Sequence, residues 1–259
     1  MGFHALPVDE EFIRVLAKQS GRVVLEFDFS IVKKIGSTVL LPEAEAMRLL
    51  AEHTSIPSPT LISARFGPKE GCITMDRVEG STLEDKWDTL DETSKESICH
   101  QTWDIVSKIR AIPRPPNLEG LFLCLADGSP SKDEMFKDLQ EPDRPLRSDS
   151  EVRARIFERY YEHNGRLYAN ELPDMLPRAE SSVFTHGDIA PRNIMVDDQN
   201  MITGLIDWEW AGWYPDYWEY AQILRPAFWG DWSEWMARTA QKKWDIMGIN
   251  VARKFLINT

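Results

Sequence analysis

The sequence predicts an α+β fold, with a small antiparallel sheet near the amino terminus and a larger, mainly helical part after it. Short apolar runs separated by turn residues fill the region up to Val78, which is typical of hairpins. Amphipathic segments follow, with apolar residues at helical spacing. A strand, a tight loop and a second hairpin then occupy residues 183–213, and polar residues stand where these strands stop.

The first 78 residues are predicted to form one helix, then strands and a second helix. Apolar residues at helical spacing predict a helix over residues 8–19, which Ser20-Gly21 would end. Two strands follow, then a helix with Pro42 in its first turn and a hairpin around residues 67–70. We expect these later elements over residues 22–28, 29–35, 43–53, 60–66 and 71–78.

Helices are predicted to dominate the remainder of the chain. Residues 117–148 lack periodicity and are predicted to be a long excursion of the kind that often carries substrate contacts. The last ten residues are expected to fray. Tryptophans crowd this end of the chain; an aromatic cage for a cationic ligand is one interpretation, and packing of helices is the favoured one. The predicted helices cover residues 92–112, 151–170, 216–224 and 231–245.

Composition excludes several classes of function. The charged content of 28% is ordinary, and no apolar run approaches the ~18 residues of a membrane span. Three cysteines without a C-x-x-C pair argue against a disulfide framework or a zinc site, and with no signal peptide they favour a cytoplasmic location. The net charge of −12 disfavours nucleic acid or an anionic membrane as partner. It suits a cationic substrate, although solubility alone is the favoured explanation.

The spacing of three polar residues in the 183–213 stretch indicates phosphoryl transfer. Asp188 and Asn193 are five positions apart, as in the D-x-x-x-x-N catalytic loop of protein kinases, and Asp207 ends the next hairpin. Phosphoryl transfer needs a carboxylate beside the attacking hydroxyl and oxygen ligands for Mg²⁺. We therefore predict Asp188 as the base and Asn193 and Asp207 as metal ligands.

A plainer interpretation of each residue has to be weighed. A single aspartate after a strand is usually a turn former or a helix cap. Three residues that agree in type and spacing make that interpretation of Asp188 the weaker one. His186 precedes the predicted base, and we expect it to orient the loop by hydrogen bonding rather than to take part in the chemistry.

The motif resembles one known family. His-Gly-Asp-Ile-Ala-Pro-Arg-Asn at 186–193 and Ile-Asp-Trp-Glu at 206–209 are similar to the aminoglycoside phosphotransferase family, a relative of the protein kinases. The longer run at 206–220 is similar to a fungal branch of that family. The resemblance implies a two-lobed, protein-kinase-like fold, with a small nucleotide-binding lobe over residues 1–78 and a large lobe over residues 79–259. It also implies transfer of the γ-phosphate of ATP or GTP to a hydroxyl group of a small molecule.

The same resemblance assigns residues to the nucleotide. Lys34 matches the lysine that binds the phosphates, with Lys33 as the alternative. Glu43 matches its partner glutamate, and Glu45 is the alternative because one shift of register exchanges the two. Residues 75–80 resemble the hinge between lobes, where Asp76 and Val78 would bind adenine through main-chain groups.

One departure from the family pattern bears on turnover. A kinase-like small lobe normally has a glycine-rich loop over the phosphates, but no glycine lies between Gly21 and Lys34. Ser20-Gly21 alone is available to approach a phosphate. An alternative prediction is therefore a kinase-like binding module with little turnover. A protein kinase is disfavoured, because Ile-Asp-Trp-Glu replaces Asp-Phe-Gly and no Ala-Pro-Glu segment follows.

Overall fold

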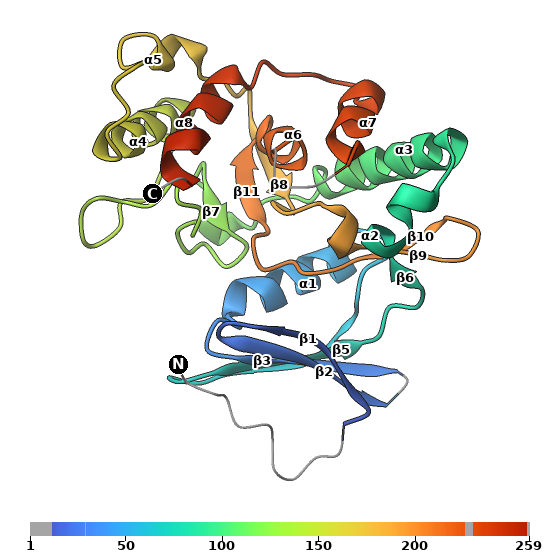
Figure 1. The fold of residues 1–259 in the computed structure, drawn as a ribbon. Helices are drawn as coiled ribbons and strands as arrows, with labels where there is room; N and C mark the ends of the chain where they lie inside the picture. The colour runs from blue at the N-terminus through green and yellow to red at the C-terminus, as the bar shows by residue number, and fades with distance from the viewer. Residues whose placement is uncertain (1–11, 29, 226–229, 258–259) are drawn as a thin grey trace.

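The computed structural model describes residues 12–28, 30–225 and 230–257 of the chain. Figure 1 shows a twisted sheet and one helix in the lower part, and the remaining strands and helices above them. The predicted α+β class is confirmed, because the antiparallel strands come first and the helices are concentrated later in the chain.

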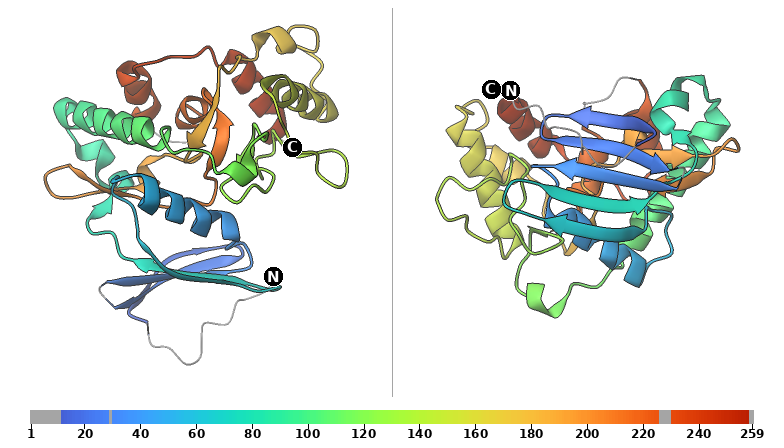
Figure 2. Two further views of the ribbon diagram at one scale, coloured as in Figure 1. Left: turned by 180° about the vertical axis from the view of Figure 1, so that it is seen from behind. Right: turned by 90° about the horizontal axis from the view of Figure 1, so that it is seen from below.

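The first sheet has five antiparallel strands in the order β1-β2-β3-β5-β4. Helix α1 (Leu41–His53) lies along one face, and Figure 2 shows the opposite face with no helix across it. In the register of β2 and β3, Arg22 faces Gly36 and Val24 faces Lys34. Since side chains alternate along a strand, Arg22 and Lys34 point to the same face. The strands are β1 (Arg14–Gln19), β2 (Arg22–Asp28), β3 (Ile31–Gly36), β4 (Leu61–Phe66) and β5 (Gly71–Asp76).

The predicted helix over residues 8–19 is wrong where the structure describes it. Arg14–Gln19 forms strand β1, and residues 1–11 lie outside the described residues. Gly21 adopts φ +83°, which turns the chain back so that β1 pairs with β2. The side chains of β1 are all exposed, so the helical spacing of Val15 and Leu16 did not mark a buried face. Backbone pairing with β2 decided the conformation instead.

The larger part of the chain is organised by helix α3 (Glu92–Ile109), which buries the predicted apolar face. Asp91 caps this helix by accepting a hydrogen bond from the Ser94 amide at 2.7 Å. Buried apolar side chains continue from α1 through α3 to the strands that follow Ser182, and a second cluster joins α4, α5 and α8. The other helices are α2 (Leu83–Lys86), α4 (Asp149–Glu162), α5 (Leu172–Met175), α6 (Trp218–Ile223), α7 (Trp232–Thr239) and α8 (Met247–Ile257).

The ends of two predicted helices, and the predicted fraying of the C-terminal end, need correction. Helix α4 ends at Glu162 rather than near residue 170, because Asn164 adopts φ +60° ahead of Gly165 and stops it. Helix α7 ends at Thr239, before the predicted residue 245. The C-terminal end does not fray up to residue 257: α8 packs against α4 and α5 and buries Ile249 and Ala252.

Two three-stranded sheets in this larger part carry the motif of residues 183–213. One has the order β10-β9-β6 and the other β7-β11-β8. The predicted strand and hairpin are confirmed as β8, β9 and β10, whereas β11 was not predicted. The strands are β6 (Ser81–Thr82), β7 (Cys124–Leu125), β8 (Ser182–Thr185), β9 (Ile194–Val196), β10 (Ile202–Leu205) and β11 (Gly212–Pro215).

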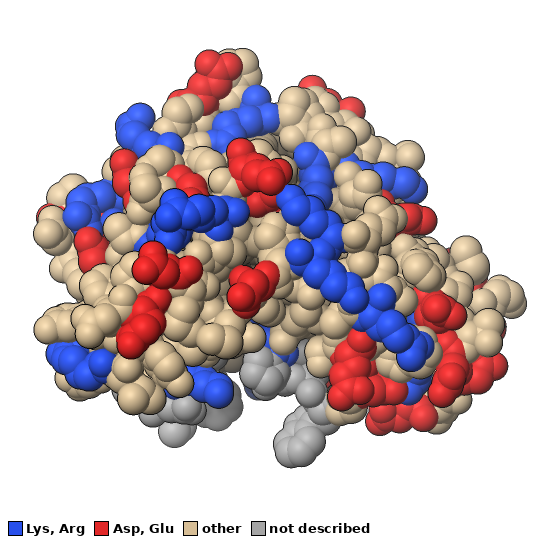
Figure 3. Space-filling view, turned by 90° about the horizontal axis from the view of Figure 1, so that it is seen from above, with Lys and Arg blue, Asp and Glu red and all other residues tan. Residues whose placement is uncertain are grey.

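The C-terminal tryptophans form packing contacts, as the favoured interpretation predicted. Trp208, Trp213, Trp218 and Trp232 are each 1% exposed. The upper face of the larger part carries side chains of both charges, with acidic side chains most concentrated at the lower right of the view in Figure 3. None of the helices within the described ranges combines the length and apolar character that crossing a membrane requires.

Candidate active site

The loop between β8 and β9 is fixed from beneath by His186. Its Nε2–H donates to the Ile206 carbonyl at 3.0 Å, and its Nδ1 accepts from the Asp188 amide at 3.1 Å. The ring is fully buried, and burial lowers its pKa below the ordinary value, so it stays neutral and can serve both contacts. His186 therefore orients the loop, as expected from the sequence.

Glu219 of α6 binds the same loop from the other side. Its carboxylate accepts from the His186 amide at 2.6 Å and from the Gly187 amide at 3.2 Å. Gly187 adopts φ +84°, and a Cβ there would lie 3.0 Å from the Trp210 carbonyl oxygen. Burial raises the pKa of Glu219 to about 7, despite these amides and the nearby Arg110 guanidinium.

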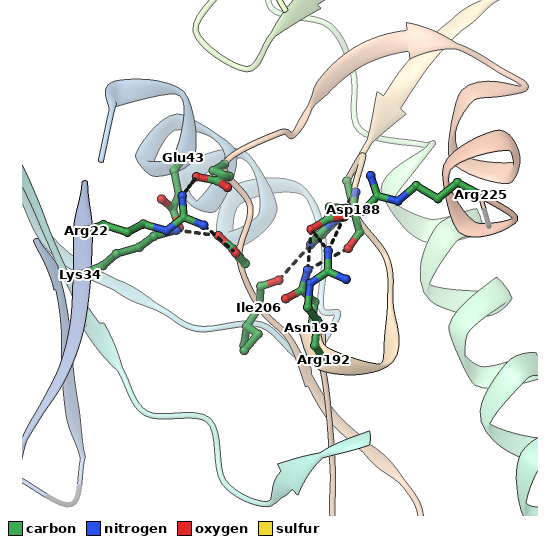
Figure 4. A network of polar contacts seen from close by, with 11 residues as sticks. Arg22, Lys34, Glu43, Asp188, Arg192, Asn193, Ile206 and Arg225 are labelled. Atoms are coloured by element: carbon green, nitrogen blue, oxygen red, sulfur yellow. Dashed lines mark hydrogen bonds and ion pairs between the residues drawn. The ribbon is translucent and has the colours of Figure 1, made fainter. Parts of the chain in front are cut away.

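The Asp188 side chain projects from this loop and is almost fully buried. Its Oδ2 accepts from Asn193 Nδ2 at 3.0 Å, and the Asp188 carbonyl accepts from the same nitrogen at 2.8 Å. Arg192 Nη2 lies 2.7 Å from Oδ1 and 2.6 Å from Oδ2, and Arg225 Nη2 also donates to Oδ1. We call Asp188, Arg192 and Arg225 the Asp188 cluster (Figure 4).

Asp207 is brought next to this loop by the hairpin. The Ile206 amide donates to the Asn193 carbonyl at 2.9 Å, so Asp207 follows directly on a contact with the predicted metal ligand. Asp207 itself adopts φ +65°, a left-handed conformation that costs a non-glycine residue roughly 1–2 kcal/mol. Strain of this kind persists where surrounding contacts over-determine the conformation, and here Lys34 supplies such a contact.

Lys34 joins the first sheet to Asp207. Its Nζ lies 2.6 Å from Asp207 Oδ1 and 2.8 Å from Glu43 Oε1, and the lysine is 4% exposed. Burial opposes the charge on Lys34, but the nearby carboxylates outweigh it, so the pKa of Lys34 lies above its ordinary value. Burial also opposes ionisation of Asp207, yet Lys34 and Arg22 hold the pKa of Asp207 below its usual range. Burial raises the pKa of Glu43.

Arg22 reaches the same place from the start of β2. Its Nη1 lies 2.5 Å from Glu209 Oε2, and its Nη2 lies 3.6 Å from Asp207 Oδ2. We call Arg22, Lys34, Glu43, Asp207 and Glu209 the Lys34 cluster. Figure 4 shows Arg22, Lys34 and Glu43 gathered on one side of the site, with Asp188, Arg192 and Arg225 across from them.

The structure separates the alternatives that the sequence left open. Lys33 Nζ lies 4.3 Å from the centre of the Phe27 ring, whereas Lys34 points into the site. Glu45 pairs with Arg48 on the outside of α1. The alternation of β3 and the turn of α1 thus bring Lys34 and Glu43 together.

The two predicted hinge residues, Asp76 and Val78, lie where the chain leaves the first sheet. The Asp76 amide donates to the Thr60 carbonyl at 3.1 Å, and the Asp76 carboxylate accepts from the Thr60 amide at 2.5 Å. Val78 packs so closely on Gly204 that a Cβ there would lie 2.5 Å from Val78 Cγ1. The Asp76 side chain therefore ties β5 to β4 and does not face the site through its carboxylate.

Several residues of the site were not found by sequence reasoning. Glu209 ends the Ile-Asp-Trp-Glu motif, and the structure pairs it with Arg22. Arg192 stands inside the Pro-Arg-Asn motif, so its position next to Asn193 was a usable signal. Glu219 lies within the run at 206–220, whereas Arg22 and Arg225 lie in other segments, where no local pattern marks them.

The side chains predicted to bind metal, Asn193 and Asp207, carry oxygen atoms of the kind that a hard divalent cation prefers. The Lys34 cluster has three carboxyl groups and two cationic side chains. Asn193 donates to Asp188 through Nδ2, which turns its amide oxygen away from Asp188. Within the described part of the chain, no three His, Cys, Asp or Glu side chains form a metal site. A site with few protein carboxylates suits Mg²⁺, which is usually completed by water and substrate phosphates.

Kinase-like phosphotransferases combine a lysine–glutamate pair, an asparagine and an aspartate that bind metal, and a loop with a catalytic aspartate. The pair Lys34–Glu43, the predicted metal ligands Asn193 and Asp207, and the loop of Asp188 match this arrangement. Residues 13–246 match the model of the phosphotransferase enzyme family (APH). The chain therefore belongs to this family, and the predicted enzyme class and family resemblance are confirmed.

Solved structures agree on the fold. An aminoglycoside-3'-phosphotransferase of type VIII superposes with a TM-score of 0.59 and 18% identity, covering 95% of this chain and 93% of the other. An aminoglycoside phosphotransferase, APH(3'')-Id from Streptomyces rimosus, has a TM-score of 0.50 and 18% identity, covering 93% and 89%. These similarities show the two-lobed kinase-like fold. No curated protein matches the chain.

Proposed function

We propose that the protein transfers the γ-phosphate of ATP or GTP to a hydroxyl group of a small molecule, in a reaction that depends on Mg²⁺. The observation that carries this proposal is that side chains from separate segments of the chain meet at one place. Asp188, Asn193 and Asp207 meet at one end of a hairpin, and Lys34 reaches Asp207 from the separate first sheet at 2.6 Å. Chains of this family that share the fold are named as aminoglycoside phosphotransferases, which supports a small-molecule acceptor.

Asp188 is the proposed general base. Its carboxylate would accept a hydrogen bond from the acceptor hydroxyl, orient that hydroxyl toward the phosphate and take its proton. Asn193 fixes the carboxylate through Nδ2. Buried His186 and Glu219 fix the loop backbone around it.

Asn193 and Asp207 are the proposed metal ligands. Bound Mg²⁺ would neutralise charge on the phosphates of the nucleotide. Asp207 is kept ionised by Lys34 and Arg22, so its carboxylate is ready to bind a cation. Glu209 pairs with the second terminal nitrogen of the Arg22 guanidinium, Nη1, and adds negative charge to the same side of the site.

Lys34, paired with Glu43, is the proposed phosphate-binding lysine. Arg22 adds a second cation, and we propose that it contributes charge that amides of a glycine-rich loop would otherwise supply. The Asp76 amide is already paired with Thr60, so the Asp76 carbonyl and the Val78 amide are the main-chain groups that we assign to adenine. In this scheme residues 1–78 form the nucleotide-binding lobe and residues 79–259 the large lobe. We also propose a cytoplasmic location, on the grounds of cysteine usage.

The test is nucleotide turnover with Mg²⁺, ATP or GTP, and a mixed panel of alcohols, sugars and hydroxylated amines, with Asp188→Asn as the control. Turnover that requires one acceptor and disappears in the control supports the proposal. Absence of any Mg²⁺-dependent nucleotide binding contradicts it.

A second candidate is a nucleotide-binding module with little turnover. The specific observation in its favour is that Arg192, Arg225 and Asn193 occupy both oxygens of the Asp188 carboxylate. Nucleotide binding without turnover on any acceptor, unchanged in Asp188→Asn, would favour this candidate.

A further inference from the structure

Asp188 is held by more positive charge than a general base requires. Arg192 donates to both carboxylate oxygens at 2.7 and 2.6 Å, and Arg225 donates to Oδ1. An acceptor hydroxyl can reach the carboxylate only when one of these guanidinium contacts is exchanged for it. A guanidinium that leaves a carboxylate in a partly buried site needs another anion to replace it.

The two arginines come from different elements. Arg192 belongs to the loop of Asp188 itself, four positions further on. Arg225 follows the end of α6, and its amide caps that helix by donating to the Gln222 carbonyl at 3.2 Å. Figure 4 shows Arg225 approaching Asp188 from the side opposite Lys34 and Glu43. Arg225 therefore lies on the side where the acceptor, rather than the nucleotide, would bind.

The surroundings of Arg225 do not reverse this charge. The charge of Arg225 acts on Asp133 and Arg253, and Gln222 bridges these two by donating to Asp133 at 3.0 Å and accepting from Arg253 at 3.2 Å. Asp133 is an acidic residue and Arg253 a basic one, so the pair adds one group of each kind. Among the described residues, the Asp188 cluster together with this pair has three guanidinium groups and two carboxylates.

We propose, resting on the function proposed above, that the acceptor carries an anionic group a few bonds from the reacting hydroxyl, and that Arg225 binds this group. The anion is a carboxylate or a phosphate, both of which match the planar donor fork of arginine. When such an acceptor binds, its anion takes the Arg225 guanidinium, and its hydroxyl takes the place of Arg225 on Oδ1 of Asp188, where Arg192 stays bound. The acceptor thus uncovers the base that receives its proton.

A cationic acceptor fits this geometry poorly. Its positive charge would lie beside two guanidinium groups that already share one carboxylate. A neutral alcohol would have to break a charge-assisted hydrogen bond and offer only a neutral one in return. An anionic alcohol alone restores the contact that it breaks.

Isothermal titration calorimetry of the full chain tests this assignment. The protein is first saturated with Mg²⁺ and a non-hydrolysable ATP analogue, which occupies the position of the γ-phosphate. Glycerol 3-phosphate, glycerate, glycerol and choline are then titrated separately. The first two probes distinguish a phosphate from a carboxylate, and the last two are the neutral and cationic comparisons.

We expect at least one anionic probe to bind at least tenfold more tightly than glycerol or choline. Arg225→Gln should weaken that probe by about tenfold or more, the usual scale for a lost charged hydrogen bond, without changing the affinity of the ATP analogue. The matched control is Arg178→Gln, because Arg178 is an exposed arginine of the same part of the chain. It should change neither affinity.

Three results would overturn the inference while leaving the proposed function intact: tighter binding of glycerol or choline, no binding of either anionic probe, or full affinity in Arg225→Gln. In each case the ATP analogue still binds with Mg²⁺. Failure of the analogue itself to bind would overturn the proposed function, and the inference with it.

Discussion

The Lys34 cluster and the Asp188 cluster are both partly buried networks of charged side chains, but they have opposite charge balances. The first contains Glu43, Asp207 and Glu209 against two cations. The second contains one carboxylate against two guanidinium groups. Because unbalanced charge is costly where side chains are partly buried, we expect each network to bind a ligand of the sign that it lacks. The first is suited to a cation and the second to an anion.

The two clusters also differ in how the chain assembles them. Asp188 and Arg192 are four residues apart in one loop, and only Arg225 is remote. The Lys34 cluster draws on β2, β3, α1 and the segment after β10, and three of its contacts span more than 170 residues. A local motif can therefore indicate a site such as the Asp188 cluster, whereas the Lys34 cluster depends on the whole fold.

Removing the Asp207 carboxylate from the Lys34 cluster should have the largest effect on nucleotide binding. In Asp207→Ala the cluster loses its proposed charged metal ligand, so we expect Mg²⁺-dependent nucleotide binding to disappear. Calorimetry with ATP, with and without Mg²⁺, measures this directly. Asp198→Ala is the matched control, because the Asp198 side chain is 96% exposed in the turn of the same hairpin. Undiminished Mg²⁺-dependent binding in Asp207→Ala would exclude the metal role.

The corresponding change in the Asp188 cluster should affect a different quantity. Asp188→Asn removes the proposed base but preserves its shape, so transfer should fall by at least ~10², the usual scale for general-base catalysis. Nucleotide affinity should be nearly intact, since the Lys34 cluster is untouched. Steady-state rates and calorimetry on the same sample separate the two effects. An equal loss of nucleotide affinity would indicate that Asp188 is structural.

This contrast explains what the sequence could predict. Asp188, Asn193 and Asp207 were found because the chemistry fixes their types and spacing, and the strands around them are short apolar runs with clear ends. Strand β1 was mistaken for a helix because pairing with β2 outweighs local periodicity at an exposed edge. Arg22 and Arg225 were missed because a single arginine has no pattern, and only the folded chain places each one beside an acid.

A smaller effect tests whether Arg22 acts on the nucleotide. Arg22→Gln leaves Glu209 without its cation and removes positive charge near the proposed phosphate position, so we expect Mg²⁺·ATP to bind about tenfold more weakly. Arg14→Gln in the same hairpin is the control, because the Arg14 side chain is 56% exposed and pairs with Glu26 instead. Equal losses of affinity in both variants would assign the effect to the stability of the hairpin.

The last prediction concerns stability rather than binding or rate, through the residue that supports the Asp188 loop. The pKa of Glu219 rises from 4.5 to about 7 on folding, mainly through burial. Between these two values the unfolded chain releases a proton that the folded chain retains. The contribution of Glu219 to the free energy of unfolding should therefore decrease as the pH rises through this window, by at most about 1.4 kcal/mol per pH unit. Above about pH 7 both states are ionised and the decrease should stop.

Urea unfolding of the wild type and of Glu219→Gln across this window measures the contribution. The difference in unfolding free energy, wild type minus variant, should fall with rising pH, since glutamine does not titrate. If the unfolding free energies of the wild type and the variant change with pH in parallel, Glu219 is ionised in the folded protein throughout this window. The amides of His186 and Gly187 favour that state. In that case the loop beneath the Asp188 cluster would carry a full buried negative charge. That charge would offset part of the guanidinium excess above it and weaken the contrast between the two clusters.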